Sequence, residues 1–239
     1  MEYASTMPVA AARRLDFVTV VAHDLRQPMS AALMAAELVE GYLDDASAVD
    51  LARKHLALAK RCLRETLQLA SDLLAMEQAE TGRLRLRRAP VDVAALLRDA
   101  TTFVAQQARA KQIDVRVRVP RALPRPRADR GRLLQVLTNL SANAVKFTQR
   151  GGRITLAATC DARDVHVSVS DSGPGLSDDE LPRVFDSHWQ GEGDAAAEGV
   201  GLGLTIARSL VEAHGGRIVA RRSPGGGLAI VFTIPLAER

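Results

Sequence analysis

The chain has 239 residues, 47% hydrophobic and 25% charged, a composition typical of soluble globular protein with one large or two modest domains. Its net charge is +4, and the Arg-rich runs Arg83–Arg88 and Arg116–Arg127 indicate solvated strand faces and linkers rather than a nucleic-acid patch. Aromatic residues make up only 3%, which argues against base stacking on nucleic acid. The two cysteines, Cys62 and Cys160, lack CxxC spacing, so neither a disulfide framework nor a zinc site is indicated.

The first predicted element is a long helix. Apolar residues recur from Leu15 to Val39 at alternating spacings of three and four, which predicts the seam of a packed helix. Gly41 and the polar run 44–47 interrupt this pattern, and a second helical repeat follows from Leu56 to Leu74. The two stretches together predict a helical hairpin.

A single hairpin cannot bury both of its apolar faces, so we expect two copies to pair into a four-helix bundle, which makes the protein a homodimer. Thr81-Gly82 closes the second helix, and the pattern then changes to alternation over Arg83–Arg87, which marks a domain boundary. The expected domains are therefore residues 1–81 and residues 82–239.

The second domain mixes strands and helices. Helical patterns are expected at 91–110, 129–147 and 203–214, and strand-like runs at 113–119, 153–159, 165–170, 217–221 and 228–234. Because paired strands adjoin directly, the pattern favours an α+β sandwich with one face of its sheet covered.

Four short motifs in this domain carry chemistry. In the first, Asn139, Asn143 and Lys146 project from one face of a predicted helix that ends at Phe147. Amide oxygens are adequate ligands for Mg²⁺, and a lysine supplies a point charge for phosphate. In the second, Asp171 ends a predicted strand and precedes a sharp Gly-Pro-Gly turn, where a buried carboxylate can accept a hydrogen bond from an exocyclic amine. Taken alone, each pattern is more often an ordinary solvated pair or turn.

The third motif is glycine-rich and opens a helix, where bare backbone and a helix N-terminus favour phosphate. It lacks the context of a P-loop or a Rossmann fingerprint. The fourth is Phe185 with the Gly- and Ala-rich segment to Glu198, which has the composition of a mobile lid. The glycine-rich motif consists of Gly199, Val200, Gly201, Leu202, Gly203 and Leu204.

These four motifs in this order resemble the N, G1, F and G2 boxes of the GHKL ATP-binding domain, which histidine kinases share with chaperone, topoisomerase and DNA-repair ATPases. The resemblance implies an α/β sandwich of the Bergerat type that binds ATP, with Mg²⁺ at Asn143 aided by Asn139. It also implies that Lys146 meets phosphate and Asp171 the adenine amino group. The residues it assigns to shaping the pocket and lid are Phe147, Gly173, Gly175, Phe185 and the glycine-rich motif.

The hairpin distinguishes among these relatives. Residues 21–28, Val-Ala-His-Asp-Leu-Arg-Gln-Pro, resemble the H box of the histidine kinase dimerisation domain. The implied activity is that of a two-component sensor histidine kinase core: ATP-dependent phosphorylation of His23 and transfer to an aspartate of a separate response regulator. Phosphorylation of His23 requires a neutral imidazole nitrogen, and Asp24 is the candidate to hold the other ring nitrogen and accept its proton. Pro28 removes a backbone donor and is expected to kink the helix.

Three departures from the family pattern qualify this expectation. His188 and Gln190 replace the second Phe and the Arg of the lid box, and Gln27 stands where kinases with phosphatase activity carry Thr or Asn. We also expect no input domain within these 239 residues. No apolar run approaches the roughly 20 residues of a membrane span, so we expect a cytoplasmic chain, or the cytosolic core of a longer or membrane-bound sensor. The alternatives are a phosphotransfer or docking module with a degenerate ATP site, and a GHKL ATPase clamp.

Overall fold

The computed structural model describes residues 9–42, 46–81, 83–186, 189 and 203–236. The chain divides into two compact units, Met1–Leu74 and Ala75–Arg239, and each is treated by itself below. The predicted boundary between residues 81 and 82 coincides with the end of a helix rather than with this division, and it stays a prediction.

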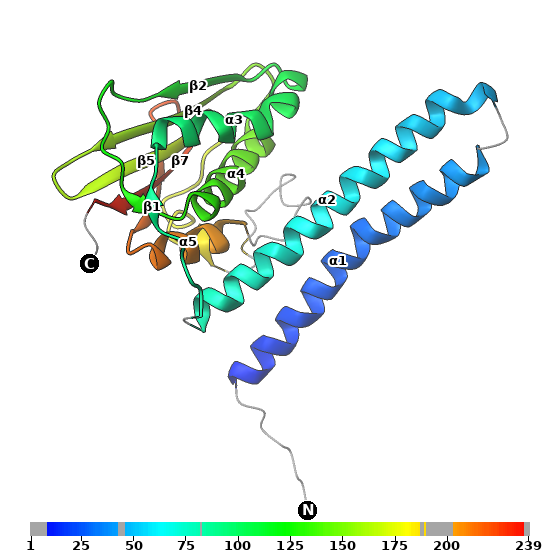
Figure 1. Ribbon diagram of the computed structural model, residues 1–239, viewed down its shortest axis with the longest axis horizontal. Coiled ribbons are helices and arrows are strands. Elements are labelled where there is room, and N and C mark those ends of the chain that lie inside the picture. Colours follow the sequence, from blue (N-terminus) through cyan, green and yellow to red (C-terminus); the bar gives the residue numbers. More distant parts are fainter. Residues whose placement is uncertain (1–8, 43–45, 82, 187–188, 190–202, 237–239) are drawn as a thin grey trace, which may run out of the picture. The chain divides into compact units, whose positions relative to one another are not determined.

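The first unit is a helical hairpin, as the repeat of apolar residues predicted (Figure 1). Helix α1 spans Val9–Gly41, a short 3₁₀ turn η1 spans Ala46–Ala48, and α2 spans Val49–Glu80, its last turns reaching into the second unit. Pro28 lies inside α1, and the predicted kink there stays a prediction. None of the helices in the described ranges is long and apolar enough to cross a membrane.

The side chains of this hairpin are distributed unusually. The buried apolar side chains among its described residues are small: Ala32 and Ala35 on α1, and Ala59 and Cys62 on α2. Large apolar side chains instead lie exposed to solvent on both helices, at Met29, Leu33, Met34, Leu38, Leu51, Leu56, Leu63, Leu67 and Leu74. A soluble monomer rarely exposes so many large apolar groups along one element pair, so this surface is suited to contact with another chain.

The second unit is built on a five-stranded sheet in the order β2-β4-β5-β7-β6. Strands β2 and β4 are parallel and the other neighbours are antiparallel. The bounds are β2 Asp114–Arg118, β4 Arg153–Cys160, β5 Asp164–Asp171, β6 Ile218–Arg222 and β7 Leu228–Pro235. All five lie within two residues of the predicted strands.

Helices from the described residues cover one face of this sheet (Figure 1). They are α3 Val93–Ala110, α4 Arg130–Phe147 and α5 Gly203–Ala213, with a 3₁₀ turn η2 at Arg183–Phe185. Along β5 the alternate residues Val165, Val167, Val169 and Asp171 are buried, while those between them are partly exposed. The expected α+β sandwich, with one sheet face covered and the other open, is confirmed.

The alternating run Arg83–Arg87 forms no strand. Its arginines are exposed and its leucines are partly buried, so the alternation reflects burial without a partner strand. The pairing begins just beyond it, where β1 Ala89–Pro90 runs antiparallel to β3 Arg127–Ala128. A two-residue ladder carries no periodic signal, so the sequence did not reveal it.

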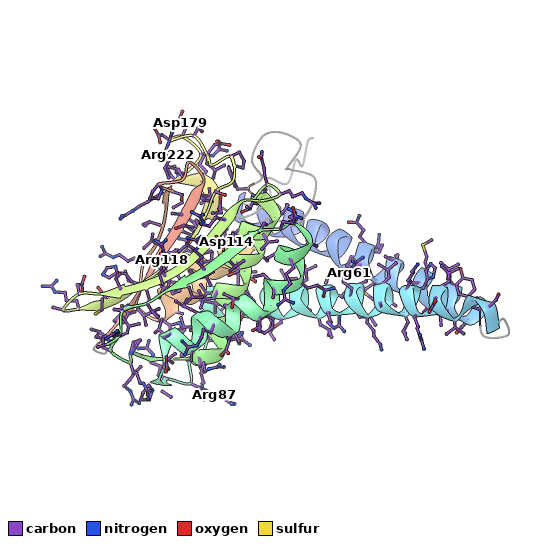
Figure 2. All side chains as sticks on the ribbon, turned by 90° about the horizontal axis from the view of Figure 1, so that it is seen from above. Arg61, Arg87, Asp114, Arg118, Asp179 and Arg222 are labelled. Carbon is purple, nitrogen blue, oxygen red and sulfur yellow. The ribbon has the colours of Figure 1, made fainter. Side chains whose placement is uncertain are left out.

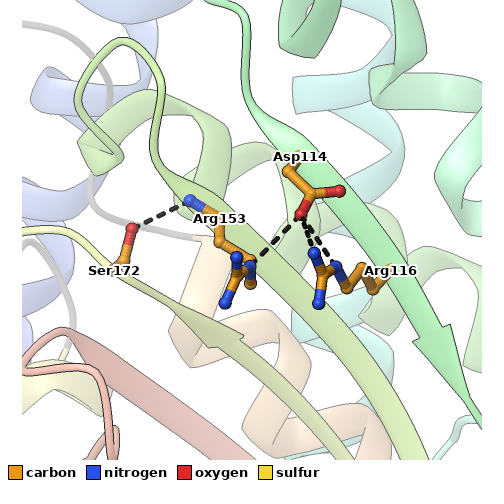
Figure 3. Close-up of polar contacts among 4 residues, drawn as sticks. All are labelled: Asp114, Arg116, Arg153 and Ser172. Carbon is orange, nitrogen blue, oxygen red and sulfur yellow. Dashed lines mark hydrogen bonds and ion pairs between the residues drawn. The ribbon is translucent and has the colours of Figure 1, made fainter.

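Arginine side chains also lie on the sheet itself. Arg118 is on β2 and Arg222 is on β6, the two edge strands (Figure 2). At the start of β2, Asp114 Oδ2 accepts a hydrogen bond from Arg116 Nε at 2.7 Å and one from Arg153 Nε at 3.2 Å (Figure 3). Arg153 N–H donates to Ser172 Oγ at 2.9 Å. These groups are about half exposed, so the cluster contributes little to stability, but part of the basic charge predicted to be solvated is locally balanced.

His214 joins the end of α5 to the start of α4. Its imidazole is buried, with Nδ1 2.7 Å from the Leu210 carbonyl oxygen and Nε2 accepting the N–H of Asp129 at 3.0 Å. This pattern fixes the neutral tautomer with hydrogen on Nδ1. Asp129 is the N-cap of α4, where its Oδ1 accepts from Arg132 N–H, and its Oδ2 accepts from Arg87 N–H. Burial raises the pKa of Asp129, but these backbone N–H groups outweigh burial and lower it overall.

This junction should make the second unit acid-sensitive. Burial lowers the pKa of His214 below its ordinary value of about 6.5. Above pH 6.5 the His214 imidazole is neutral in both the folded and the unfolded chain, and its contribution to the free energy of unfolding is fully present. Below pH 6.5 the His214 imidazole binds a proton in the unfolded chain but not in the folded one. The free energy of unfolding therefore falls by up to about 1.4 kcal/mol per pH unit until the pKa of the folded state is reached.

Urea unfolding followed through Trp189, the only tryptophan of the chain, measures this loss for the second unit. The wild type should lose stability between pH 6.5 and 5 more steeply than His214→Gln. Parallel curves for the two proteins would show that His214 is not responsible.

Candidate functional site

A cavity of about 210 Å³ lies between α4, the sheet and the segment around η2. Its walls are mostly apolar, and the polar or charged side chains among the described lining residues belong to Asn143, Asp171 and Glu180. The described residues that line it are Leu140, Asn143, Ala144, Phe147, Val169, Asp171, Pro174, Gly175, Leu176, Glu180, Val184, Trp189, Leu204, Leu228 and Ile230.

Helix α4 supplies the first wall. It buries Leu133, Leu137 and other apolar residues against the rest of the fold, which leaves Asn143 and Phe147 facing the cavity. The Lys146 ammonium lies 4.8 Å from the centre of the Phe147 ring, a cation–π contact. Asn139, one turn before Asn143, does not line the cavity; its Nδ2 donates to the Gly203 carbonyl oxygen at 3.4 Å.

The last turn of α4 is held from outside the helix. Lys111 Nζ, just beyond α3, donates to the carbonyl oxygens of Val145 and Lys146 at 2.8 Å each. These carbonyls lie at the C-terminal end of the helix, where no further turn follows to supply N–H partners, and a cation is favourable there. Lys111 therefore helps to fix the turn that carries Lys146 and Phe147.

Asp171 ends β5 at the floor of the cavity and is only 8% exposed. Its Oδ1 accepts hydrogen bonds from Gly173 N–H at 2.8 Å and Leu228 N–H at 3.2 Å. Burial raises the pKa of Asp171, and the two backbone N–H groups oppose that rise. Both of these hydrogen bonds use Oδ1, so the carboxyl has a defined orientation in a largely apolar cavity.

Close backbone packing around Asp171 requires glycine. A Cβ on Gly173 would lie 2.8 Å from the Phe147 carbonyl oxygen, and one on Gly227 would overlap the Asp171 carbonyl and carboxyl oxygens. Gly175 has φ of +71° and no room for a Cβ beside the Gly226 carbonyl oxygen. Gly173 and Gly175 were predicted to shape the pocket. Gly227 was missed because it lies just before β7, more than fifty residues along the chain from Asp171.

The start of α5 and η2 form the remaining wall. Leu204 lines the cavity, and Thr205 Oγ1 donates to the Phe185 carbonyl oxygen at 3.1 Å, which ties η2 to α5. Phe185 is buried beneath this contact and is not a lining residue. The predicted Gly199, Val200, Gly201 and Leu202 lie outside the described residues, as do His188 and Gln190.

The structure thus brings five predicted residues to one cavity: Asn143, Phe147, Asp171, Gly175 and Leu204. Asn139, Lys146, Gly173, Phe185 and Gly203 lie beside it without lining it, and the roles of all ten stay predictions. Sequence reasoning missed Glu180 and the apolar walls, and it gave Trp189, which lies in the predicted lid segment, no role of its own. Glu180 accepts from Ser177 N–H and Oγ at 2.8 Å each, a Ser-x-x-Glu spacing that could have been noticed.

His23 and Asp24 both lie in α1, but their side chains are outside what the structure describes. Their predicted roles are therefore carried by the sequence pattern alone.

The donor set of the cavity fits a nucleotide with a hard cation. A flat heterocycle suits the apolar walls, and the Asp171 carboxyl can accept from an exocyclic amine. Within the described residues no three His, Cys, Asp or Glu side chains converge on a point, so a cation would be held by the Asn143 amide oxygen, phosphate oxygens and water, as Mg²⁺ prefers.

Each of the two units is similar to known protein families. Residues 13–82 match the family model of the His Kinase A (phospho-acceptor) domain, and residues 128–238 match that of the histidine kinase-, DNA gyrase B-, and HSP90-like ATPase. The signal transduction histidine-protein kinase BaeS of Escherichia coli is 31% identical over 98% of this chain and 50% of its own length. The adaptive-response sensory kinase SasA of Synechococcus elongatus is 34% identical over 92% of this chain and 58% of its own. The chain thus spans about half the length of these relatives.

Solved structures show the same fold. Full-length ShkA, crystallised in complex with AMPPNP, superposes with a TM-score of 0.70 and is 31% identical over 94% of this chain and 46% of its own. ThkA, crystallised with the response regulator protein TrrA, superposes with a TM-score of 0.63 over 95% of this chain and 64% of its own, at 24% identity. The chain therefore belongs to the histidine kinases and carries their catalytic core, a His Kinase A domain followed by a GHKL-type ATPase domain.

Proposed function

We propose that this chain binds ATP with Mg²⁺ in the cavity beside α4 and transfers the γ-phosphoryl group to His23. The observation that carries the proposal is the buried Asp171 carboxyl, oriented by two backbone N–H groups, in a cavity that Asn143 also lines. An apolar cavity with one directed acceptor binds an amino-substituted base, and an amide oxygen on its rim suits the phosphate-bound cation.

Each residue has a distinct task in this proposal. Asp171 accepts from the adenine amino group and so sets the register of the nucleotide. Asn143, aided by Asn139, holds Mg²⁺, which neutralises charge on the phosphates, and Lys146 contacts phosphate. The glycine-rich motif Gly199–Leu204 covers the phosphates.

His23 acts as the nucleophile. A ring nitrogen of the neutral imidazole forms a bond to the γ-phosphorus while the bond from that phosphorus to the β,γ-bridging oxygen breaks, and ADP leaves. Asp24 orients the ring through its other nitrogen and accepts the proton that the ring loses. The phosphoryl group then passes to an aspartate of a separate response regulator, and the reaction takes place in the cytosol, where ATP is available.

The exposed Leu and Met side chains of α1 and α2 support the proposed homodimer, in which two hairpins bury them in a four-helix bundle. Light scattering of the full chain tests this: we expect the mass of two chains, and a monomer at all concentrations would contradict it.

Incubation with γ-labelled ATP and Mg²⁺ tests the enzymatic proposal. We expect an acid-labile, alkali-stable label on the protein, lost in His23→Ala and kept in His55→Ala, whose histidine lies on α2 with Nδ1 2.9 Å from the Leu51 carbonyl oxygen. Release of free phosphate without labelled protein would indicate an ATPase clamp instead. Neither label nor phosphate would indicate a docking module.

A further inference from the structure

The only tryptophan of the chain lines the cavity; it lies in the segment from Phe185 to Glu198 that was predicted as a lid, but it was assigned no role of its own. Trp189 is half-buried, and its backbone N–H donates to the Asp186 carbonyl oxygen at 3.2 Å. Asp186 caps η2, whose Val184 lines the same cavity and whose Phe185 carbonyl is bonded to Thr205 of α5. The backbone that carries the indole is thus tied to elements that also form the cavity wall.

The chemistry of the cavity indicates which part of a nucleotide this indole meets. Among the described lining residues there are two aromatic rings, Trp189 and Phe147, and no cationic side chain. Phosphate requires cations or several N–H donors, whereas an indole offers one N–H and a large apolar face. Bases stack on aromatic faces, and the Asp171 acceptor for an exocyclic amine lies in the same cavity.

We propose that Trp189 forms one wall of the base subsite and contacts the purine ring, as a residue that positions the nucleotide and contributes to its affinity. This rests on the proposed function, in which the cavity binds ATP. Its role is independent of the phosphates, so its contribution is the same for ATP and ADP. Because the chain has a single tryptophan, occupancy of the cavity also changes the indole emission of the whole protein.

The test combines calorimetry with tryptophan fluorescence on the full chain, using ATP with Mg²⁺ and ADP with Mg²⁺ as probes. We expect a saturable change in indole emission with both nucleotides, at the Kd that calorimetry gives. Trp189→Ala should weaken ATP and ADP by the same factor, about 10-fold, and Trp189→Phe by less than about threefold, because a phenyl ring still stacks. Phe103→Ala removes an aromatic side chain that is 63% exposed on α3 and outside the cavity, and should leave both affinities unchanged.

Three results would overturn the proposal: unchanged emission at calorimetric saturation, unchanged affinity in Trp189→Ala, or a much larger loss for ATP than for ADP. The last would place the indole at the phosphates. Should Trp189→Ala fail to fold, the emission change in the wild type and the affinity of Trp189→Phe still decide. Calorimetry that detects no ATP binding to the wild type would refute the proposed function itself, whereas binding without any of the Trp189 effects refutes this inference alone.

Discussion

Replacing Asp171 by asparagine should weaken ATP binding by about 100-fold while leaving the second unit folded. An asparagine oxygen can take the place of Oδ1 and still accept from Gly173 and Leu228 N–H. The amide NH₂ then occupies the position of Oδ2, so a donor faces the donor amine of adenine. Calorimetry with ATP measures the affinity, and label transfer to His23 should fall in parallel at low ATP concentration.

The stability of this variant separates lost binding from lost folding. Burial raises the pKa of Asp171, which means that the charged carboxylate is disfavoured in its site, so a neutral amide should not destabilise the protein without nucleotide. Asp161→Asn is the matched control: Asp161 accepts from two backbone N–H groups and contacts His166, and it lies at the other end of β5, away from the cavity. Normal affinity in Asp171→Asn would refute the assigned role of Asp171.

Local patterns predicted the elements of the second unit well. The apolar spacing in 129–147 gave α4 to within one residue, and the alternation in 165–170 gave β5 with its buried face. The same helical spacing predicted that Asn139, Asn143 and Lys146 share one face, and of these Asn143 lines the cavity while the other two lie beside it. These features depend on residues a few positions apart, which is the range over which periodicity operates.

What sequence reasoning could not supply comes from contacts between distant segments. The backbone of Gly227 and Leu228 holds a carboxyl 57 residues away, and no spacing rule links the two. His214 belongs to no motif, and only the fold shows that it is buried against the N-cap of α4. Trp189 was given no role within the predicted lid segment, because the function of a lone aromatic residue becomes visible only through the cavity that it lines.

In the hairpin the opposite holds: the sequence pattern indicates a contact between chains that the fold of a single chain does not show. The hairpin was predicted to pair with a second copy, and in the single chain many large apolar side chains of both helices lie exposed, while the buried apolar ones among its described residues are small. A repeat of apolar residues reflects burial in an assembly as well as within one chain, which is why the exposed surface supports the proposed homodimer.

Gly227→Ala should destabilise the second unit by about 3 kcal/mol and also impair nucleotide binding. A Cβ at this position would lie 2.7 Å from Gly173 N and in closer overlap with the Asp171 carbonyl oxygen and Oδ1. The chain can relieve this overlap only by moving the start of β7 away or by rotating Asp171. Either movement breaks hydrogen bonds that orient the carboxyl, so stability and affinity should fall together.

Gly225→Ala is the control, two residues earlier in the same turn. Its Cβ would have no neighbour closer than 3.9 Å, so we expect the free energy of unfolding and the Kd for ADP to stay near wild type. Urea unfolding followed through Trp189 and calorimetry with ADP measure the two quantities on each variant. A Gly227→Ala protein that is destabilised but binds ADP normally would show that the carboxyl keeps its orientation without the Gly227–Leu228 backbone. Loss of both would establish that this approach of β7, which no motif contains, orients the base-recognising group of the site.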